Sequence, residues 1–198
     1  MKLQNQYFVL RHGESLRNVL KMASCWPEKI KSPLTEKGIR QIKRAAKELK
    51  KKKIDLIFSS DLLRTKQTAE IVAREIGLKV RLDKRLREVD VGVLNNKPID
   101  EIGRFWDKEK KLSSLEYFKK RFKIAPDKGE NYVQLEKRMY DFFQEMEKRY
   151  KGKNILIVSH QRPITLLDKA VHNHSLEKLV KTIVGKREIK TGEVRKLA

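Results

Sequence analysis

Polar residues suited to phosphate chemistry follow three short apolar runs of the chain. They are RHG at 11–13, SSD at 59–61 and SHQR at 159–162. Ligands of open α/β sheets bind at the carboxyl ends of the strands. If the three runs are neighbouring strands, His12 and His160 face one cleft. Arg64, one helical turn beyond the second run, then reaches the same cleft.

Two histidines and two arginines at one place can both bind and attack a phosphate. The guanidinium groups of Arg11 and Arg64 match phosphate oxygens in a bidentate manner and stay charged. Cations around His12 favour its neutral form, and neutral imidazole is a nucleophile toward phosphorus. His160 can stabilise charge on the phosphoryl oxygens. The carboxyl of Glu88, which follows the third predicted strand, can protonate the leaving oxygen.

Strands and helices alternate along the chain, which is typical of a layered α/β domain. Strands are predicted at 7–10, 56–58, 79–82, 154–158 and 193–197. The continuous apolar run at 155–158 is typical of a central parallel strand. We therefore predict a three-layer α/β sandwich, in which a mostly parallel central sheet has helices on both faces and an inserted lid segment.

Helix signals lie between the predicted strands. Thr35 is a candidate N-cap for a helix with a regularly spaced apolar face, and Ser60 or Asp61 is a candidate cap for a helix that ends before Gly77. Further helices are predicted at 131–150, after Pro163 and at 176–184.

Residues 95–130 show no clean strand pattern and contain short amphipathic pieces. We expect a single domain over 1–198 in which 95–130 folds over the strand ends as a lid. Four of its residues are candidates for recognising a second anionic group or an aromatic group, namely Arg104, Trp106, Lys108 and Lys110. A solvated helical face is the alternative explanation for them.

The composition favours anionic partners. The chain has 48 basic and 26 acidic residues, a net charge of +22, which attracts phosphorylated metabolites, nucleic acid or anionic lipid. Because the lysines are spread along the chain, solvated surfaces explain them without a dedicated nucleic-acid surface.

Three observations bear on location. The single cysteine, Cys25, cannot form an internal disulfide, in agreement with a reducing compartment. No apolar run approaches the roughly 20 residues that span a bilayer. The N-terminal stretch has no signal-peptide pattern. We expect a cytoplasmic protein with no membrane partner.

Six blocks of the sequence occur in the order and at the spacing of a known family. They are RHGES, SPLTEKGIRQ, FSSDLLRTKQTAE, LREVDVG, GENYVQLEKRM and VSHQRPI. Through them the chain resembles the histidine phosphatase superfamily, in the phosphoglycerate-mutase-like branch that includes compact broad-specificity phosphatases. The resemblance covers nearly the whole chain and is weakest over 95–125.

The resemblance implies a role for each matching residue. His12 would be the nucleophile that forms a phosphohistidine. Three residues would hold the phosphoryl group, namely Arg11, Arg64 and His160. Glu88 would be the general acid for the leaving alcohol and then the base for the attacking water. Asn18 would add a phosphate contact, with a turn or capping role as the alternative.

Two positions depart from the family pattern. Gln161 stands where a glycine often follows the second histidine, and its amide is a candidate contact to substrate. Leu94-Asn95-Asn96 replaces the family's WEG, which places the loop around Glu88 in doubt and leaves Asp90 as a substitute acid.

Two further patterns carry less weight. His172 and His174 have the HxH spacing of metal ligands, but no third ligand is evident, and a turn followed by a helix cap explains them. Cys25 is expected to pack in a loop rather than to react. The sequence contains neither GxxxxGK[ST] nor GxGxxG, the glycine motifs of two kinds of nucleotide-binding fold.

We expect a metal-independent phosphatase that needs no cofactor and hydrolyses small phosphomonoesters through a phosphohistidine on His12. A cofactor-dependent phosphoglycerate mutase is the first alternative, since it shares every catalytic residue, although the length of 198 residues fits the compact phosphatases. A cationic protein that binds nucleic acid or another polyanion through a vestigial pocket is the second. The intact residue set argues against that alternative, and the sequence leaves the oligomeric state open.

Overall fold

The computed structural model describes residues 3–197, and five strands form one sheet at its centre. The strands are β1 (Gln6–Arg11), β2 (Leu56–Ser59), β3 (Val80–Leu82), β4 (Asn154–Ser159) and β5 (Val194–Lys196). Their order in the sheet is β3-β2-β4-β1-β5. The first four are parallel, and β5 pairs antiparallel with β1. The prediction of a mostly parallel central sheet is confirmed.

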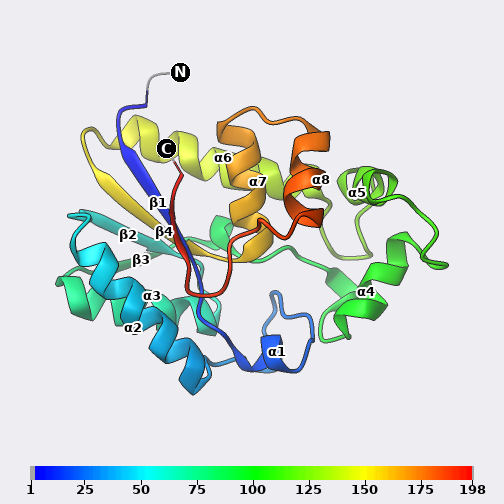
Figure 1. The fold of residues 1–198 in the computed structure, drawn as a ribbon, viewed down its shortest axis with the longest axis horizontal. Helices are drawn as coiled ribbons and strands as arrows, with labels where there is room; N and C mark the ends of the chain where they lie inside the picture. Colours follow the sequence, from blue (N-terminus) through cyan, green and yellow to red (C-terminus); the bar gives the residue numbers. More distant parts are fainter. Residues whose placement is uncertain (1–2, 198) are drawn as a thin grey trace.

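Helices cover both faces of this sheet (Figure 1). One layer contains α2 (Glu36–Lys50) and α3 (Leu63–Ile76), and the other contains α6 (Tyr132–Arg149) and α7 (Gln161–Val171). Successive residues of a strand point to opposite faces, so β1 sends Phe8 and Leu10 toward α2 and α3, and Tyr7 and Val9 toward α6 and α7. The predicted three-layer sandwich is confirmed.

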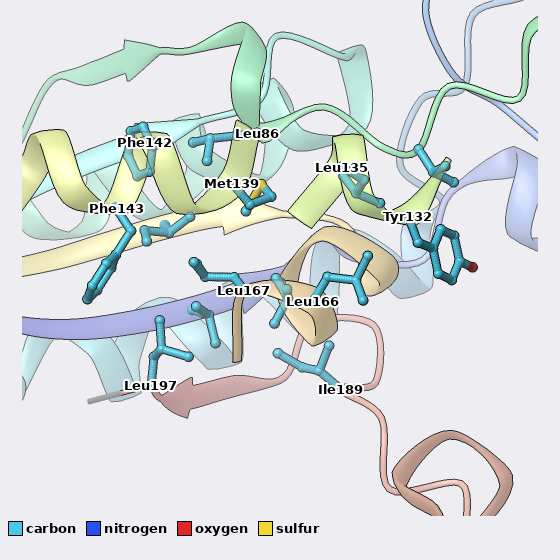
Figure 2. Packing of buried hydrophobic residues seen from close by; sticks show 14 of the residues in the cluster. Leu86, Tyr132, Leu135, Met139, Phe142, Phe143, Leu166, Leu167, Ile189 and Leu197 are labelled. Carbon is cyan, nitrogen blue, oxygen red and sulfur yellow. The ribbon is translucent and has the colours of Figure 1, made fainter. Parts of the chain in front are cut away.

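The core on the α6 and α7 side is the larger of the two. It contains the buried face of α6, with Leu135, Met139 and Phe142, together with Leu166 and Leu167 of α7 (Figure 2). Burial of these side chains fixes α7 against the sheet, because each fully buried large apolar residue contributes about 1.5–3 kcal/mol. The N-terminus of α7 is thereby held at the carboxyl end of β4.

The segment 95–130 forms two short helices at one end of the molecule, α4 (Ile99–Trp106) and α5 (Ser114–Lys123) (Figure 1). Before them come α1 (Leu16–Val19) and two 3₁₀ turns, η1 (Lys84–Leu86) and η2 (Gly92–Leu94), and near the C-terminus lies α8 (Leu176–Val184), which packs on α5. The buried indole of Trp106, at the end of α4, donates a 2.9 Å hydrogen bond to the carbonyl of Ile124 and so links α4 to the end of α5.

Most predicted helix starts agree with the structure, but two differ. Thr35 caps α2 as predicted, by accepting a hydrogen bond from the Gly38 amide at 3.1 Å. The predicted cap of α3 is wrong, because Leu62 occupies that position and Asp61 instead accepts from Arg87. Helix α7 begins at Gln161 rather than after Pro163. Proline is tolerated there because amide groups in the first helical turn have no partner within the helix.

Among residues 3–197, no helix combines the length and the apolar character that crossing a membrane requires.

Candidate active site

The carboxyl ends of β1, β2 and β4 meet at one edge of the sheet. Their register places Arg11 beside Ser159 and Ser59 beside Val158. Backbone hydrogen bonds extend this alignment past the strand ends, from the His12 amide to Ser159 at 3.1 Å and from the Ser60 amide to Val158 at 3.1 Å. The three polar groups that follow the apolar runs therefore lie together, as the sequence predicts.

His12 is held in a defined orientation and protonation state. Its Nδ1 lies 2.7 Å from its neighbour's carbonyl, that of Gly13, and its Nε2 lies 3.3 Å from Nε of Arg64. A carbonyl only accepts and a guanidinium only donates, so Nδ1 carries the proton and Nε2 keeps a lone pair. Burial, then the charges of Arg64 and Arg11, lower the pKa of His12 well below its usual range. The imidazole is therefore neutral at physiological pH.

Arg64 is a buried cation that links His12 to the loop after α1. Its guanidinium donates to the carbonyl of Ser24 at 2.8 Å and to the hydroxyl of the same residue at 3.1 Å. It also pairs with Glu28 at 3.2 Å, and both side chains of this pair are about nine-tenths buried. Burial lowers the pKa of Arg64, yet arginine stays protonated at any working pH. Arg64 thus presents a fixed positive charge to Nε2 of His12.

His160 lies directly beside His12, with 5.1 Å between the ring centroids. Its Nε2 is 3.1 Å from the hydroxyl of Ser60, while its buried Nδ1 has no partner in the part of the chain that the structure describes. Burial, followed by the charge of Arg64, lowers the pKa of His160 well below its usual range. Unlike His12, His160 does not line the adjoining cavity. His160 therefore packs against the ring of His12 from outside the cavity lining.

A cavity of about 210 Å³ opens at these strand ends. It is strongly cationic, since five arginines line it and Glu88 is its one lining carboxylate among the residues described; the arginines are Arg11, Arg17, Arg64, Arg121 and Arg162. The guanidinium of Arg11 donates to the carbonyl of Ile189 at 3.0 Å, and its buried Nε has no partner. Such a lining suits a small ligand with a phosphate group.

Glu88 lines the cavity and Asp90 does not. One oxygen of the Glu88 carboxylate accepts from the Val89 amide at 2.9 Å. The Asp90 carboxylate instead accepts from the Gly92 amide at 2.9 Å and lies 3.5 Å from the sulfur of Cys25. The placement favours Glu88 over Asp90 as the acid, despite the departure from the family pattern at 94–96.

Arg138 positions the loop of Glu88, a role that sequence reasoning missed. From α6, this side chain donates to the carbonyls of Arg85 and Glu88, the latter at 3.1 Å. It also pairs with Glu130 at 2.6 Å, and Glu130 accepts from the Asp90 amide at 2.9 Å. Both charged residues belong to the block GENYVQLEKRM, so a signal was present in the sequence.

Asn18 and Gln161 both line the cavity. The side-chain oxygen of Asn18 accepts from the amide and hydroxyl of Ser15, at 3.0 and 2.9 Å, so it also shapes the turn into α1. Gln161 and Arg162, the first two residues of α7, line the cavity, so the N-terminus of this helix lies beside it. Helix N-termini favour anions, which adds to the positive field of the arginines.

The residues that 95–130 contributes to the cavity are not those expected from the sequence. Arg104, Trp106, Lys108 and Lys110 lie outside its lining; Trp106 is buried and the other three are exposed. Ile99, Ile102 and Arg121 line it instead. The expectation failed because it rested on charged residues, whereas α4 presents the buried Ile102 and the exposed Ile99 to the cavity.

Two remaining predictions concern Cys25 and the HxH pair. Cys25 is buried, and burial raises the pKa of its thiol to about 12, which fits the packing role predicted for it. The statement that His172 and His174 have no third partner is wrong, because the Asp168 carboxylate lies with them in one cluster. The helical spacing between 168 and 172 was a signal for this contact.

Comparison with known proteins identifies the family. The profile of the histidine phosphatase superfamily (branch 1) matches residues 7–194. A protein of Yersinia pestis (strain Pestoides F) called "Probable phosphoglycerate mutase GpmB" is 36% identical over 160 residues, which cover 78% of this chain and 69% of that protein.

Solved structures share the fold. One is a mycobacterial glucosyl-3-phosphoglycerate phosphatase in complex with VO3, with 25% identity and a TM-score of 0.79 over 96% of this chain and 90% of the other. Another is Bacillus stearothermophilus YhfR, with 29% identity and a TM-score of 0.73 over 88% and 83%.

Proposed function

The chain belongs to branch 1 of the histidine phosphatase superfamily, and on that premise we propose that it hydrolyses phosphomonoesters through a phosphohistidine on His12. That the protein is a phosphoryl-transfer enzyme rests on its relatives, whose names describe phosphatases and mutases. The proposal that it is a phosphatase that uses His12 rests on the residues around His12. The substrate class is a small phosphorylated metabolite that fits a cavity of about 210 Å³.

The observation that carries the proposal is the state of His12. Its Nε2 lone pair is held toward a cavity lined with arginines, while Nδ1 donates to Gly13. A phosphate that enters would take over the hydrogen bond from Arg64 and leave Nε2 free to attack. Neutral imidazole is the form that reacts.

In the first step, Nε2 of His12 forms a bond to phosphorus as the bond from phosphorus to the ester oxygen breaks. Glu88 gives its proton to that oxygen, so the alcohol leaves neutral. Arg11, Arg64 and the free amides of α7 stabilise charge on the phosphoryl oxygens. The role of a metal ion as a Lewis acid falls to the guanidinium groups in this proposal.

In the second step, water attacks the phosphorus of the phosphohistidine. Glu88, now a carboxylate, takes the proton of the water, and the bond between nitrogen and phosphorus breaks. Inorganic phosphate leaves, and His12 returns to its neutral state. Glu88 is protonated again before the next turnover, so atoms and protons balance over the cycle.

Hydrolysis of p-nitrophenyl phosphate in EDTA tests the proposal, with His12→Ala against a matched His172→Ala variant at the exposed histidine. We expect turnover inhibited by vanadate in wild type and His172→Ala, and none above background in His12→Ala. Turnover that persists in His12→Ala would remove this histidine from the mechanism.

Substrates with different leaving groups test whether Glu88 acts as a general acid. p-Nitrophenolate leaves without a proton, whereas an alkoxide needs one, so Glu88→Gln should impair propyl phosphate more than p-nitrophenyl phosphate by at least about 10-fold. Asp90→Asn is the matched control and should change both rates less than threefold. An equal loss on both substrates in Glu88→Gln would contradict a general-acid role.

Mutase activity is the second candidate, favoured by the name of the Yersinia pestis relative. It uses the same residues but returns the phosphoryl group to an organic acceptor. Incubation with 3-phosphoglycerate, with both inorganic phosphate and the 2-phospho isomer measured, distinguishes them. Phosphate release supports the phosphatase, and isomer without phosphate release overturns it.

The net charge of +22 keeps a polyanion-binding protein as a third reading. Retention on a nucleic-acid column that depends on salt and is unchanged in His12→Ala, together with no turnover of any phosphomonoester, would favour that function.

A further inference from the structure

Arg121 of α5 is a buried cation with no anionic partner among residues 3–197. It is 8% exposed and lines the cavity. Its guanidinium lies over two aromatic rings, 4.1 Å from the centroid of Trp106 and 4.4 Å from that of Tyr132. Among the described residues, its guanidinium donates a single hydrogen bond, from Nη1 to the hydroxyl of Tyr117 at 3.1 Å, and its Nε has no partner.

The aromatic stack holds the charge of Arg121 without neutralising it. Cation–π contacts fix the plane of a guanidinium and leave its N–H edges free. No ion pair among residues 3–197 includes Arg121. A buried charge without a counterion is costly, so this arrangement indicates that the missing anion is a ligand.

Arg17 of α1 repeats the pattern in the same cavity. It is 5% exposed, its Nε has no partner, and its guanidinium donates to the side-chain oxygen of Asn96 rather than to a carboxylate. Neither Arg17 nor Arg121 lies at the end of a strand, whereas Arg11 is the last residue of β1 and Arg64 lies on the helix after β2. Two cations are thus available besides those assigned to the phosphoryl group.

We propose that Arg121, together with Arg17, binds a second anionic group of the substrate, a carboxylate or a second phosphate. The inference rests on the proposed function, since it assigns the first anionic group to the site of His12. Ile99, Ile102 and Val91 line the same cavity and suit the carbon chain that joins the two groups. The enzyme should therefore select phosphomonoesters that carry a second negative charge.

Three short substrates test this selectivity: propyl phosphate, phosphoglycolate and 1,3-propanediol bisphosphate. They share a primary phosphate and differ in the other end, which is neutral, a carboxylate or a phosphate. We expect wild-type kcat/KM to be higher for one of the anionic substrates than for propyl phosphate. Arg121→Met, which keeps the apolar stem on the rings, should lower kcat/KM for that substrate about 10- to 100-fold and change propyl phosphate less than threefold.

Arg104→Met on the exposed face of α4 is the matched control and should leave the whole profile unchanged. Arg121→Lys should retain part of the preference because the charge remains. Thermal unfolding of each variant shows whether it folds. An equal loss on all three substrates, or no preference in wild type, would overturn the subsite.

Failure of the subsite and failure of the proposed function give different results. If p-nitrophenyl phosphate is hydrolysed without any preference for a second anion, only the subsite is wrong. If nothing is hydrolysed, calorimetric binding of phosphoglycolate and propyl phosphate still compares the two ends. Tighter binding of phosphoglycolate that is lost in Arg121→Met would support the subsite alone, and equal binding would overturn it.

A separate cluster lies at the opposite end of α7. The ligand atoms of Asp168, His172 and His174 lie within 4.8 Å of one another. Asp168 lies in the last turn of α7 and His172 directly follows the helix, with 3.1 Å between Oδ1 and Nδ1. Asn173 has the left-handed φ of 49°, and the His174 amide donates to the carbonyl of Lys169 at 2.9 Å, so the chain folds back and brings the rings together.

We infer that this cluster binds a divalent transition-metal ion such as Zn²⁺ or Ni²⁺. Two imidazoles and a carboxylate are the ligand types that such ions prefer, and water would complete the coordination. The site lies at the C-terminus of α7, about 16 Å along the helix from the candidate active site. It therefore acts on the α7–α8 junction rather than on catalysis.

Calorimetric titration of the full chain with ZnCl₂ and NiCl₂ tests this site. We expect one ion per chain and at least about 10-fold weaker binding in His174→Ala and Asp168→Asn, with binding unchanged in the control Asp141→Asn. A higher melting temperature with Zn²⁺ in wild type but not in His174→Ala would agree. Binding that is unaffected by either cluster variant would overturn the site.

Discussion

Two parts of the cavity are built in different ways. The floor consists of Arg11, His12 and Arg64, which line the cavity, and of His160, which packs against His12 outside the lining. These residues lie at the ends of adjacent strands or, for Arg64, on the helix after β2, and backbone hydrogen bonds between the strands fix their places. The wall, which consists of Ile99, Ile102 and Arg121, lies on two short helices joined through aromatic side chains. A floor set by backbone register tolerates few changes, whereas a wall set by side-chain packing is free to vary with the substrate.

Close backbone contact distinguishes the floor further. A methyl group on Gly13 would lie 2.6 Å from the carbonyl oxygen of Gly38, and one on Gly38 would lie 2.0 Å from the carbonyl oxygen of Glu14. The loop after His12 therefore rests directly on the first turn of α2. In the wall, a methyl group on Gly103 would meet only the Tyr117 hydroxyl at 3.9 Å.

The largest effect is expected from Arg64→Lys in the floor. Lysine keeps the charge but cannot contact His12, Ser24 and Glu28 at once, as the guanidinium does. Turnover should fall about 10²- to 10³-fold, the usual cost of losing one donor to a developing anion. Steady-state kinetics measure this, with Arg87→Lys as the control, since Arg87 pairs with Asp61 outside the cavity. Comparable losses of turnover in both variants would show that Arg64 contributes no more to catalysis than Arg87 does.

The next effect concerns stability. Gly38→Ala should lower the free energy of unfolding by about 1–3 kcal/mol, the usual cost of overpacking, because the added carbon meets backbone that cannot rotate away. Chemical denaturation measures it, and turnover should fall with it as the loop of His12 moves. An unchanged denaturation midpoint would show that the loop adjusts freely.

A pH dependence of stability follows from the two buried histidines of the floor. Their pKa values are lowered in the folded protein, so the unfolded chain binds more protons below its ordinary histidine pKa. The free energy of unfolding should therefore fall as pH drops below about 6.5, by up to about 1.4 kcal/mol per pH unit for each histidine.

Denaturation from pH 7.5 to 5.0 measures this slope in wild type and in His12→Gln. The slope should be smaller in His12→Gln by the contribution of one histidine. His172→Gln changes an exposed ring and is the control. If wild type and His12→Gln have the same slope, His12 is not held neutral by the fold.

The smallest effect is expected in the wall and has the opposite sign. Gly103→Ala adds a methyl group in open space within α4 and removes the conformational freedom of glycine in the unfolded chain. It should raise the free energy of unfolding by about 0.5–1 kcal/mol and leave turnover of p-nitrophenyl phosphate unchanged. Destabilisation instead would show that the wall is packed as tightly as the floor.

The same contrast explains what could be predicted from the sequence. The placement of His12 and Arg11 follows from apolar runs and parallel pairing, since the polar residue after a buried strand has only one place to lie. The mostly parallel sheet and the helix predicted at 131–150, which is α6, follow from periodicity. Residues that are close together in the sequence determine these features, so local patterns predict them.

Other contacts depend on residues far apart in sequence, and no local pattern encodes them. Arg121 meets the cavity because α5 packs near Trp106 and Tyr132, and Arg138 reaches Glu88 across 50 residues. The cap of α3 was mispredicted for the same reason, since Asp61 is engaged by Arg87 from another loop. The lid function of 95–130 and the catalytic roles of the floor residues stay predictions for the experiments above.

The order of the sheet also has a consequence for biosynthesis. β1 is translated before both of its neighbours in the sheet, β4 and β5. Until residues 154–159 emerge, the apolar strand before His12 has no partner, and such unpaired segments are the ones that aggregate or recruit chaperones. Its pairing is also long-range and slow to form. Nascent chains that stop before β4 should therefore lack the phosphate site altogether, and ribosome stalling would yield inactive chains rather than partly active ones.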